Sequence, residues 1–150
     1  MRTFSAFLCL AAAAPLNAAV LTVSNEPGQP AQYSDINAAY TAADPNDTLY
    51  ISGSPTSYGG LFMEKPLTLI GAGYNLPASA PTTLDYIYLK DGCSGTNLIG
   101  LSFVTCRPNY DNSTGITGLL IERCAGSVSN HNGLPVDQVL VKNSNINSIN

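Results

Sequence analysis

A short apolar segment that returns along the chain constrains this sequence more than any other feature. In each copy, apolar residues alternate with variable ones, which is the period of a half-buried β-strand. The copies are Leu49-Tyr50-Ile51, Leu67-Thr68-Leu69, Leu101-Ser102-Phe103, Leu119-Leu120-Ile121 and Val139-Leu140-Val141. Aligned on Ile51, Leu69, Leu101, Leu119 and Val139, they are 18, 32, 18 and 20 residues apart. Turn-rich sequence follows each copy, so the pattern predicts a coil of short strands that stacks on itself.

The amino-acid composition argues against some classes of binding partner. Charged residues make up 11% of the 150 residues, against about a quarter in an ordinary globular domain. The net charge of −4 argues against nucleic acid or an anionic membrane as the main partner. Trp is absent and eight Tyr outnumber four Phe, and Tyr suits a sheet surface with one wet face.

Residues 1–18 have the layout of a secretory signal peptide. Arg2 gives a basic start, and the apolar run from Phe4 to Ala14 is too short to span a bilayer. Cleavage after Leu16-Asn17-Ala18 or Asn17-Ala18-Ala19 would leave residues 19–150, with five basic and ten acidic side chains and a net charge of −5. The alternative is a buried N-terminal strand or helix. We expect export, to the medium or the cell surface, and no further segment has the length to span a membrane.

The mature chain is predicted to begin with a strand at Ala19 to Ser24, followed by a break rich in Pro and Gly. Ser34 is expected to be the N-cap of a short helix from about Asp35 to Ala43. Its apolar residues stand at helical spacing: Ile36, Ala39, Tyr40 and Ala43. A lone helix before an array of strands is suited to covering the open end of a β-coil.

Three runs in this region carry a family resemblance: Tyr33-Ser34-Asp35-Ile36-Asn37-Ala38-Ala39-Tyr40, Asn46-Asp47-Thr48-Leu49-Tyr50-Ile51 and Pro55-Thr56-Ser57-Tyr58. They resemble the N-terminal part of right-handed parallel β-helix proteins, a superfamily that includes the pectate lyase-like proteins. That superfamily pairs a helix with a Gly-Asp-Thr turn and a strand ending in Gly-x-Tyr. Asn46 stands where Gly is usual, and Asn also tolerates left-handed backbone.

The join between the leader and Ala19-Val20-Leu21-Thr22-Val23-Ser24-Asn25 is similar to that of exported β-helix proteins of Bacteroidetes-type bacteria, as is the turn Ser54-Pro55-Thr56-Ser57-Tyr58-Gly59. The resemblance implies an all-β fold, a right-handed parallel β-helix with a short N-terminal capping helix. It says little about activity, because the superfamily includes lyases, hydrolases, adhesins and inert scaffolds.

The rest of the chain is expected to complete the coils. Second strands are predicted at Tyr58 to Met63 and Tyr86 to Leu89, and loops at Tyr74 to Thr83, Arg107 to Gly115 and Ala125 to Pro135. The core columns are predicted to be Leu101/Leu119/Val139 and Phe103/Ile121/Val141, about 4.8 Å between strands. Glu122 and Lys142 should take matching outer positions. The strand pattern is still running at Asn150, so we expect further coils of the same protein downstream.

Three cysteines remain after the predicted cleavage: Cys93, Cys106 and Cys124. Cys106 and Cys124 each follow an aligned leucine by five residues, so they are expected to be neighbours in register, within reach of a disulfide. The alternative is a stack of small inward-facing residues in which Cys acts as a small hydrophobe. The disulfide state of the three thiols is left open.

Residues suited to catalysis do not form a recognisable set. His131 is the single histidine and lacks the flanking Gly of a Gly-His-Gly motif, and Arg107-Pro108 has no second Arg at the spacing of a lyase motif. The acids are scattered: Asp85, Asp91, Asp111, Glu122 and Asp137. No spacing of Cys or His indicates a metal site, and no glycine-rich nucleotide loop is present, so no cofactor is expected.

The sequence therefore favours a non-catalytic exported scaffold, adhesive or glycan-contacting, with exposed Tyr residues and loops making any contact. The alternative is the N-terminal part of a polysaccharide lyase or glycoside hydrolase whose catalytic coils lie beyond residue 150.

Overall fold

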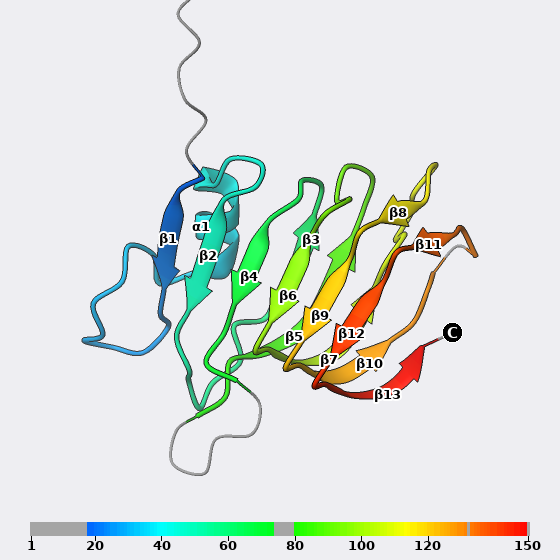
Figure 1. Cartoon of the computed structure of the whole chain (residues 1–150). Helices are drawn as coiled ribbons and strands as arrows, with labels where there is room; N and C mark the ends of the chain where they lie inside the picture. Colours follow the sequence, from blue (N-terminus) through cyan, green and yellow to red (C-terminus); the bar gives the residue numbers. More distant parts are fainter. Residues whose placement is uncertain (1–17, 74–79, 132, 150) are drawn as a thin grey trace, which may run out of the picture.

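The computed structural model describes residues 18–73, 80–131 and 133–149, and it shows short parallel strands stacked into a coil (Figure 1). Six strands form one sheet, in the order β1 (Val20–Val23), β2 (Thr48–Ile51), β4 (Thr68–Ile70), β6 (Asn97–Ile99), β9 (Leu120–Glu122) and β12 (Leu140–Lys142). Five form a second, in the order β13 (Asn145–Ile149), β10 (Ala125–Val128), β7 (Ser102–Arg107), β5 (Thr83–Leu89) and β3 (Gly60–Met63). The strands β11 (Val136–Asp137) and β8 (Ile116–Thr117) pair on a third wall. Every strand pair is parallel, so the predicted right-handed parallel β-helix is confirmed.

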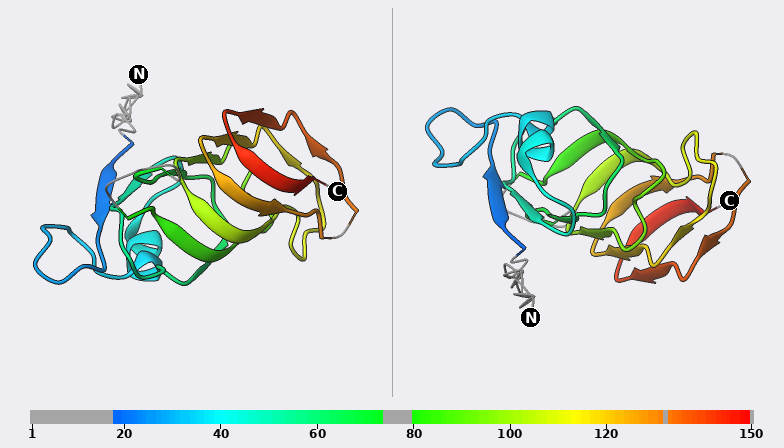
Figure 2. Two further views of the ribbon diagram at one scale, coloured as in Figure 1. Left: turned by 90° about the horizontal axis from the view of Figure 1, so that it is seen from below. Right: turned by 90° about the horizontal axis from the view of Figure 1, so that it is seen from above.

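The helix α1 (Ile36–Ala42) lies at the N-terminal end of the coil beside β1 and β2 (Figure 2). Its inner face buries Ile36 and Ala39 completely. Asp35, rather than the predicted Ser34, is the N-cap, because its backbone is still extended and its carboxylate accepts from the Ala38 amide at 2.8 Å. The Tyr40 hydroxyl accepts from the Glu64 amide at 2.7 Å, which ties the helix to the turn after β3.

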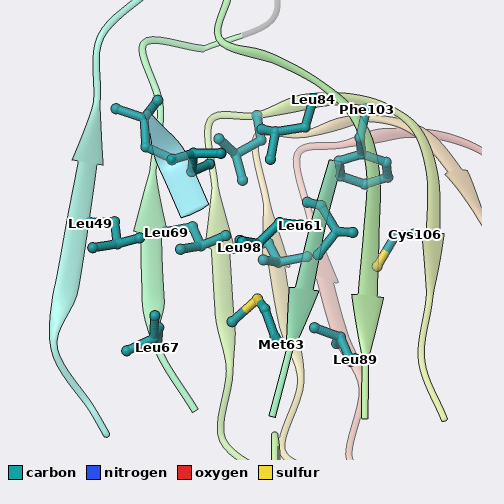
Figure 3. Close-up of a cluster of buried hydrophobic side chains, with 14 of the residues drawn as sticks. Leu49, Leu61, Met63, Leu67, Leu69, Leu84, Leu89, Leu98, Phe103 and Cys106 are labelled. Atoms are coloured by element: carbon teal, nitrogen blue, oxygen red, sulfur yellow. The ribbon is translucent and has the colours of Figure 1, made fainter. Parts of the chain in front are cut away.

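Columns of aliphatic side chains, one residue from each strand, fill the interior (Figure 3). On the six-stranded sheet the column runs through Leu21, Leu49, Leu69, Leu98, Ile121 and Val141. On the five-stranded sheet it runs through Leu61, Ile87, Cys106 and Val128. Full burial of each large aliphatic side chain contributes about 1.5–3 kcal/mol, so these two columns are a large part of what stabilises the coil.

The predicted columns are wrong at Leu101 and Phe103, because the chain turns a corner earlier than expected, and at Val139, which is 36% exposed instead of lying in the core. Gly100, with φ of 65°, sits at the corner, so Asn97–Ile99 belongs to the six-stranded sheet. Phe103 lies on the five-stranded sheet instead, paired with Leu84. Ile121 does point inward beside Val141, as predicted, but its other neighbour is Leu98.

Other predicted elements have mixed outcomes. The second strands are confirmed as β3 and β5, with β5 beginning earlier at Thr83. The predicted loop from Ala125 to Pro135 is wrong at its start, where Ala125–Val128 forms β10. Part of the predicted loop from Tyr74 to Thr83, residues 74–79, lies outside the described residues. Asn46 has φ of 72°, so it does take the left-handed turn position.

Candidate functional site

The outer face of the five-stranded sheet carries five aromatic rings from neighbouring coils, which we call the aromatic ladder. Its members are Phe62 on β3, Tyr86 and Tyr88 on β5, Tyr110 in the turn after β7 and His131 in the loop after β10. Strand alternation puts the rings outside, because the residues on either side of Phe62 and of Tyr88 are fully buried. Parallel pairing sets Phe62 directly beside Tyr88.

The rings of the ladder contact one another throughout. Tyr88 and Tyr110 are stacked with ring centroids 4.4 Å apart, and Tyr110 stacks on His131 at 4.8 Å. Tyr86 lies 4.7 Å from Tyr88. Phe62 stands edge-on to the three tyrosines, with centroids 5.2 to 5.8 Å away. Such pairs contribute about 0.5–1.5 kcal/mol each beyond burial, so the rings hold each other in place.

A glycine makes room for one ring of the ladder. The tip of Tyr86 rests on Gly60 of the next strand, where a Cβ atom would lie 1.9 Å from the Tyr86 Cζ atom. Any side chain at position 60 would therefore displace Tyr86 from the ladder.

The other end of the ladder is positioned by the buried side chain of Asn109. Its left-handed backbone, with φ of 57°, turns the chain so that Tyr110 follows on the surface. The Asn109 amide nitrogen donates to the Leu134 carbonyl at 2.9 Å, and its amide oxygen accepts from the Ile116 backbone at 3.0 Å. These bonds tie the turn that holds Tyr110 to the loop that holds His131.

The tyrosine hydroxyls of the ladder remain available for hydrogen bonding. The Tyr58 hydroxyl donates to the Ser52 carbonyl at 2.9 Å, and the Tyr40 hydroxyl accepts from the Glu64 amide at 2.7 Å. The hydroxyls of Tyr86, Tyr88 and Tyr110 have no such partner among the described residues. Each can therefore donate to, or accept from, a bound molecule.

Charged side chains follow the ladder at the carboxyl ends of its strands. Glu64, Lys90, Asp91 and Asp111 line a surface hollow of about 420 Å³. The Lys90 ammonium lies 2.8 Å from the Glu64 carboxylate, and this hydrogen bond raises the pKa of Lys90. The Arg107 guanidinium lies 5.4 Å from the Tyr88 ring centroid, a cation–π distance.

Within this hollow, Asp91 also holds a neighbouring loop in place. Its carboxylate accepts from the backbone and hydroxyl of Ser113 at 3.1 and 2.8 Å, and from those of Thr114 at 3.2 and 2.9 Å. These bonds, those from Ser113 foremost, lower the pKa of Asp91 to about 2. Asp91 thus carries a negative charge at neutral pH and holds the loop that follows the ladder.

The predicted register between Cys106 and Cys124 is not the observed one. Cys106 lies on β7 and pairs with Ile87 and Val128, whereas Cys124 lies in the corner before β10. Both are buried free thiols, and so is Cys93. Burial raises the pKa of Cys106 and of Cys93 to about 12 and also raises that of Cys124. These thiols are therefore poor nucleophiles in the folded chain.

The other residues considered as candidates for catalysis from the sequence lie partly in the ladder and partly on other walls of the coil. His131 joins the ladder, and its imidazole lies 3.9 Å from the Asp111 carboxylate. Glu122 is opposite Lys142, as predicted, although no ion pair within 4.0 Å joins these two described residues. Asp137 lies on β11, away from the five-stranded sheet. No group of three metal-binding side chains occurs in the described residues, and none of their helices has the length and hydropathy to cross a membrane.

The ladder was not identified from the sequence, which predicted only exposed tyrosines. A usable signal was present in Leu61-Phe62-Met63 and Ile87-Tyr88-Leu89, two runs with an aromatic residue between inward aliphatic ones. Tyr110 and His131 carry no such signal, because both stand in turns.

Comparison with known proteins adds no relative: no family model, curated protein or solved structure matches this chain. The fold is therefore established by strand order and register, and the function has to be argued from the surface.

Proposed function

We propose that this chain is an exported, non-catalytic β-helix scaffold that contacts a polysaccharide or a cell-surface glycan through the aromatic ladder. The observation that carries the proposal is the ladder itself, whose five rings come from four successive coils and lie on one face. Phe62 is 43% exposed and His131 is also exposed, whereas Tyr86, Tyr88 and Tyr110 are half-buried, so a large ligand reaches all five rings at least in part.

The chemistry of the ladder suits a sugar polymer. A pyranose ring has apolar C–H surfaces bordered by hydroxyls, and tyrosine offers an apolar body with a polar tip. Apolar surface with a few well-placed polar groups is the usual make-up of a ligand site. Here the polar groups are the hydroxyls of Tyr86, Tyr88 and Tyr110, which have no hydrogen-bond partner in the described part of the chain, and the charged side chains around the hollow. Solenoids present such surfaces in extended form, so one polymer chain can contact several coils at once.

The proposal includes export and a distant family tie. The signal-peptide layout of residues 1–18 supports export. The motifs around Tyr33 to Tyr58, which resemble pectate lyase-like β-helix proteins of Bacteroidetes-type bacteria, support a place among exported polysaccharide-associated proteins. N-terminal sequencing of secreted material should begin at Ala19 or Val20, and mature protein that retains Met1 would contradict export.

Binding is tested with the full chain and a panel of soluble polysaccharides, measured by isothermal titration calorimetry. Tyr88→Ala and Tyr110→Ala should each weaken binding roughly tenfold, since a lost ring contact costs about 1–1.5 kcal/mol. The matched control is Tyr50→Ala, because Tyr50 is 49% exposed but stands on the six-stranded sheet.

Equal losses in all three tyrosine variants, or no binding to any polysaccharide, would refute the ladder as a glycan site. The polysaccharide is analysed by size-exclusion chromatography before and after the titration. A shorter polymer afterwards would refute the non-catalytic part of the proposal.

A further inference from the structure

We infer that the glycan bound by the aromatic ladder is uncharged, and that the carboxylates beside the ladder exclude polyuronates. The inference rests on the proposed function, because it names the class of glycan taken by that same surface. It follows from how carboxylates and cations are distributed around the rings.

Three carboxylates line the hollow along one side of the ladder: Glu64, Asp91 and Asp111. The side chains of Glu64 and Asp111 are each 66% exposed, so both meet a ligand directly. Asp91 is kept ionised by its hydrogen bonds to Ser113 and Thr114. A polymer with a carboxylate on every sugar would pass several like charges in succession, at distances where repulsion is appreciable at low salt.

The two cations near the rings do not offset this repulsion. Lys90 is paired with Glu64 at 2.8 Å and offsets only that carboxylate, so the charges of Asp91 and Asp111 still face a ligand. Arg107 lies against the Tyr88 ring and can pair with one carboxylate of a ligand. Carboxylates therefore outnumber the cations open to a ligand, and the side of the ladder is unfavourable to a repeating anion.

The same carboxylates favour an uncharged sugar. A sugar hydroxyl can donate to Glu64 or Asp111, and a hydrogen bond to an ionised acceptor is stronger than one between neutral groups. Another hydroxyl of the same sugar can accept from a ladder tyrosine. An uncharged glycan thus gains bonds from the groups that repel a polyuronate.

The test compares a neutral soluble β-glucan with polygalacturonate of similar chain length, each titrated into the full chain at low ionic strength. The neutral polymer should bind at least severalfold more tightly than polygalacturonate. In the double variant Glu64→Gln/Asp111→Asn, the ratio of the polygalacturonate Kd to the β-glucan Kd should fall at least severalfold, because two of the repelling charges are gone. Glu122→Gln removes one charge from the six-stranded sheet and should leave the ratio unchanged.

The outcomes separate the two proposals. If polygalacturonate binds as tightly as the β-glucan and Tyr88→Ala weakens both, the ladder is a glycan site but the inferred selectivity is wrong. An unchanged ratio in the double variant would also overturn the inference. If Tyr88→Ala affects neither polymer, the proposed function itself fails.

Discussion

The two large sheets of the coil have similar interiors and different exteriors. Inside, both present columns of aliphatic side chains that are buried along most of their length. Outside, the six-stranded sheet presents a mixed row in register, Tyr50, Ile70, Ile99, Glu122 and Lys142, whereas the five-stranded sheet presents the aromatic ladder. Any coil of this geometry needs the columns, but none needs five rings on one outer face. This difference is the reason that the five-stranded face, and not the six-stranded one, is proposed as the glycan site.

Breaking the shared interior should have the largest effect. Ile121 is fully buried between Leu98 and Val141, so Ile121→Asp would bury an unpaired carboxylate. The free energy of unfolding should fall by about 3–5 kcal/mol, measured by urea denaturation followed by circular dichroism. Glu122→Gln, one residue further on the outer face, should change it by less than about 0.5 kcal/mol. Equal losses would mean that the inside and outside faces are wrongly assigned.

Substitutions at two glycines of the five-stranded sheet test strand packing and ring packing separately. A Cβ at Gly126 would lie 2.1 Å from the Phe103 carbonyl oxygen, and its φ of 152° disfavours a side chain. Gly126→Ala should cost about 1–3 kcal/mol because two strands must move apart. Gly60→Ala meets only the tip of the Tyr86 ring, which can swing away, so it should cost about 0.5–1.5 kcal/mol of ring contacts. The reverse order in urea midpoints would show that Tyr86 is fixed more firmly than the backbone.

The ladder should also contribute to stability, although less than the core. Tyr88 contacts Phe62, Tyr86 and Tyr110, whereas Tyr50 has no ring contact among the described residues. Tyr88→Ala should lower the free energy of unfolding by about 1 kcal/mol more than Tyr50→Ala, as judged from paired urea titrations. Indistinguishable losses would argue that the rings touch without stabilising one another.

The smallest effect is expected from Asp91, and it should depend on pH. Its pKa of about 2 in the folded chain lies below the value of about 3.9 for an unfolded Asp. The stabilisation is therefore complete above about pH 4 and lost as the pH falls towards 2. Asp91→Asn should flatten the fall of the urea midpoint over that window.

The double variant Ser113→Ala/Thr114→Ala is the control for this pH dependence. It should flatten the fall only in part, because it leaves two backbone donors in place. An identical fall in wild type and Asp91→Asn would place the acid sensitivity elsewhere.

The repeating strands made the fold predictable, and one polar residue upset the register. In the six-stranded sheet the residue before β6 is Thr96, where the neighbouring coils have Leu67 and Leu119. Thr96 is fully buried and its hydroxyl donates to the Cys93 carbonyl at 2.8 Å. An alignment based on apolar residues does not recognise Thr96 as a strand position. It therefore aligned the next apolar segment, which begins at Leu101, with the neighbouring coils.

The candidate site was less accessible from the sequence. Phe62 and Tyr88 follow strand alternation, but their contact depends on pairing between coils 26 residues apart. Tyr110 and His131 reach the ladder through the hydrogen bonds of Asn109, which no local periodicity encodes. Register and turn geometry, rather than composition, bring these rings together.

Because the strands stack in parallel, the aromatic ladder can be lengthened by adding coils. Each strand of the five-stranded sheet advances the ladder by about 4.8 Å, and each coil contacts chiefly its neighbours. Duplication of one coil would lengthen the ladder by one step and leave the existing steps undisturbed. The length of the ladder is therefore set by the number of coils, and it can change during evolution without a new fold.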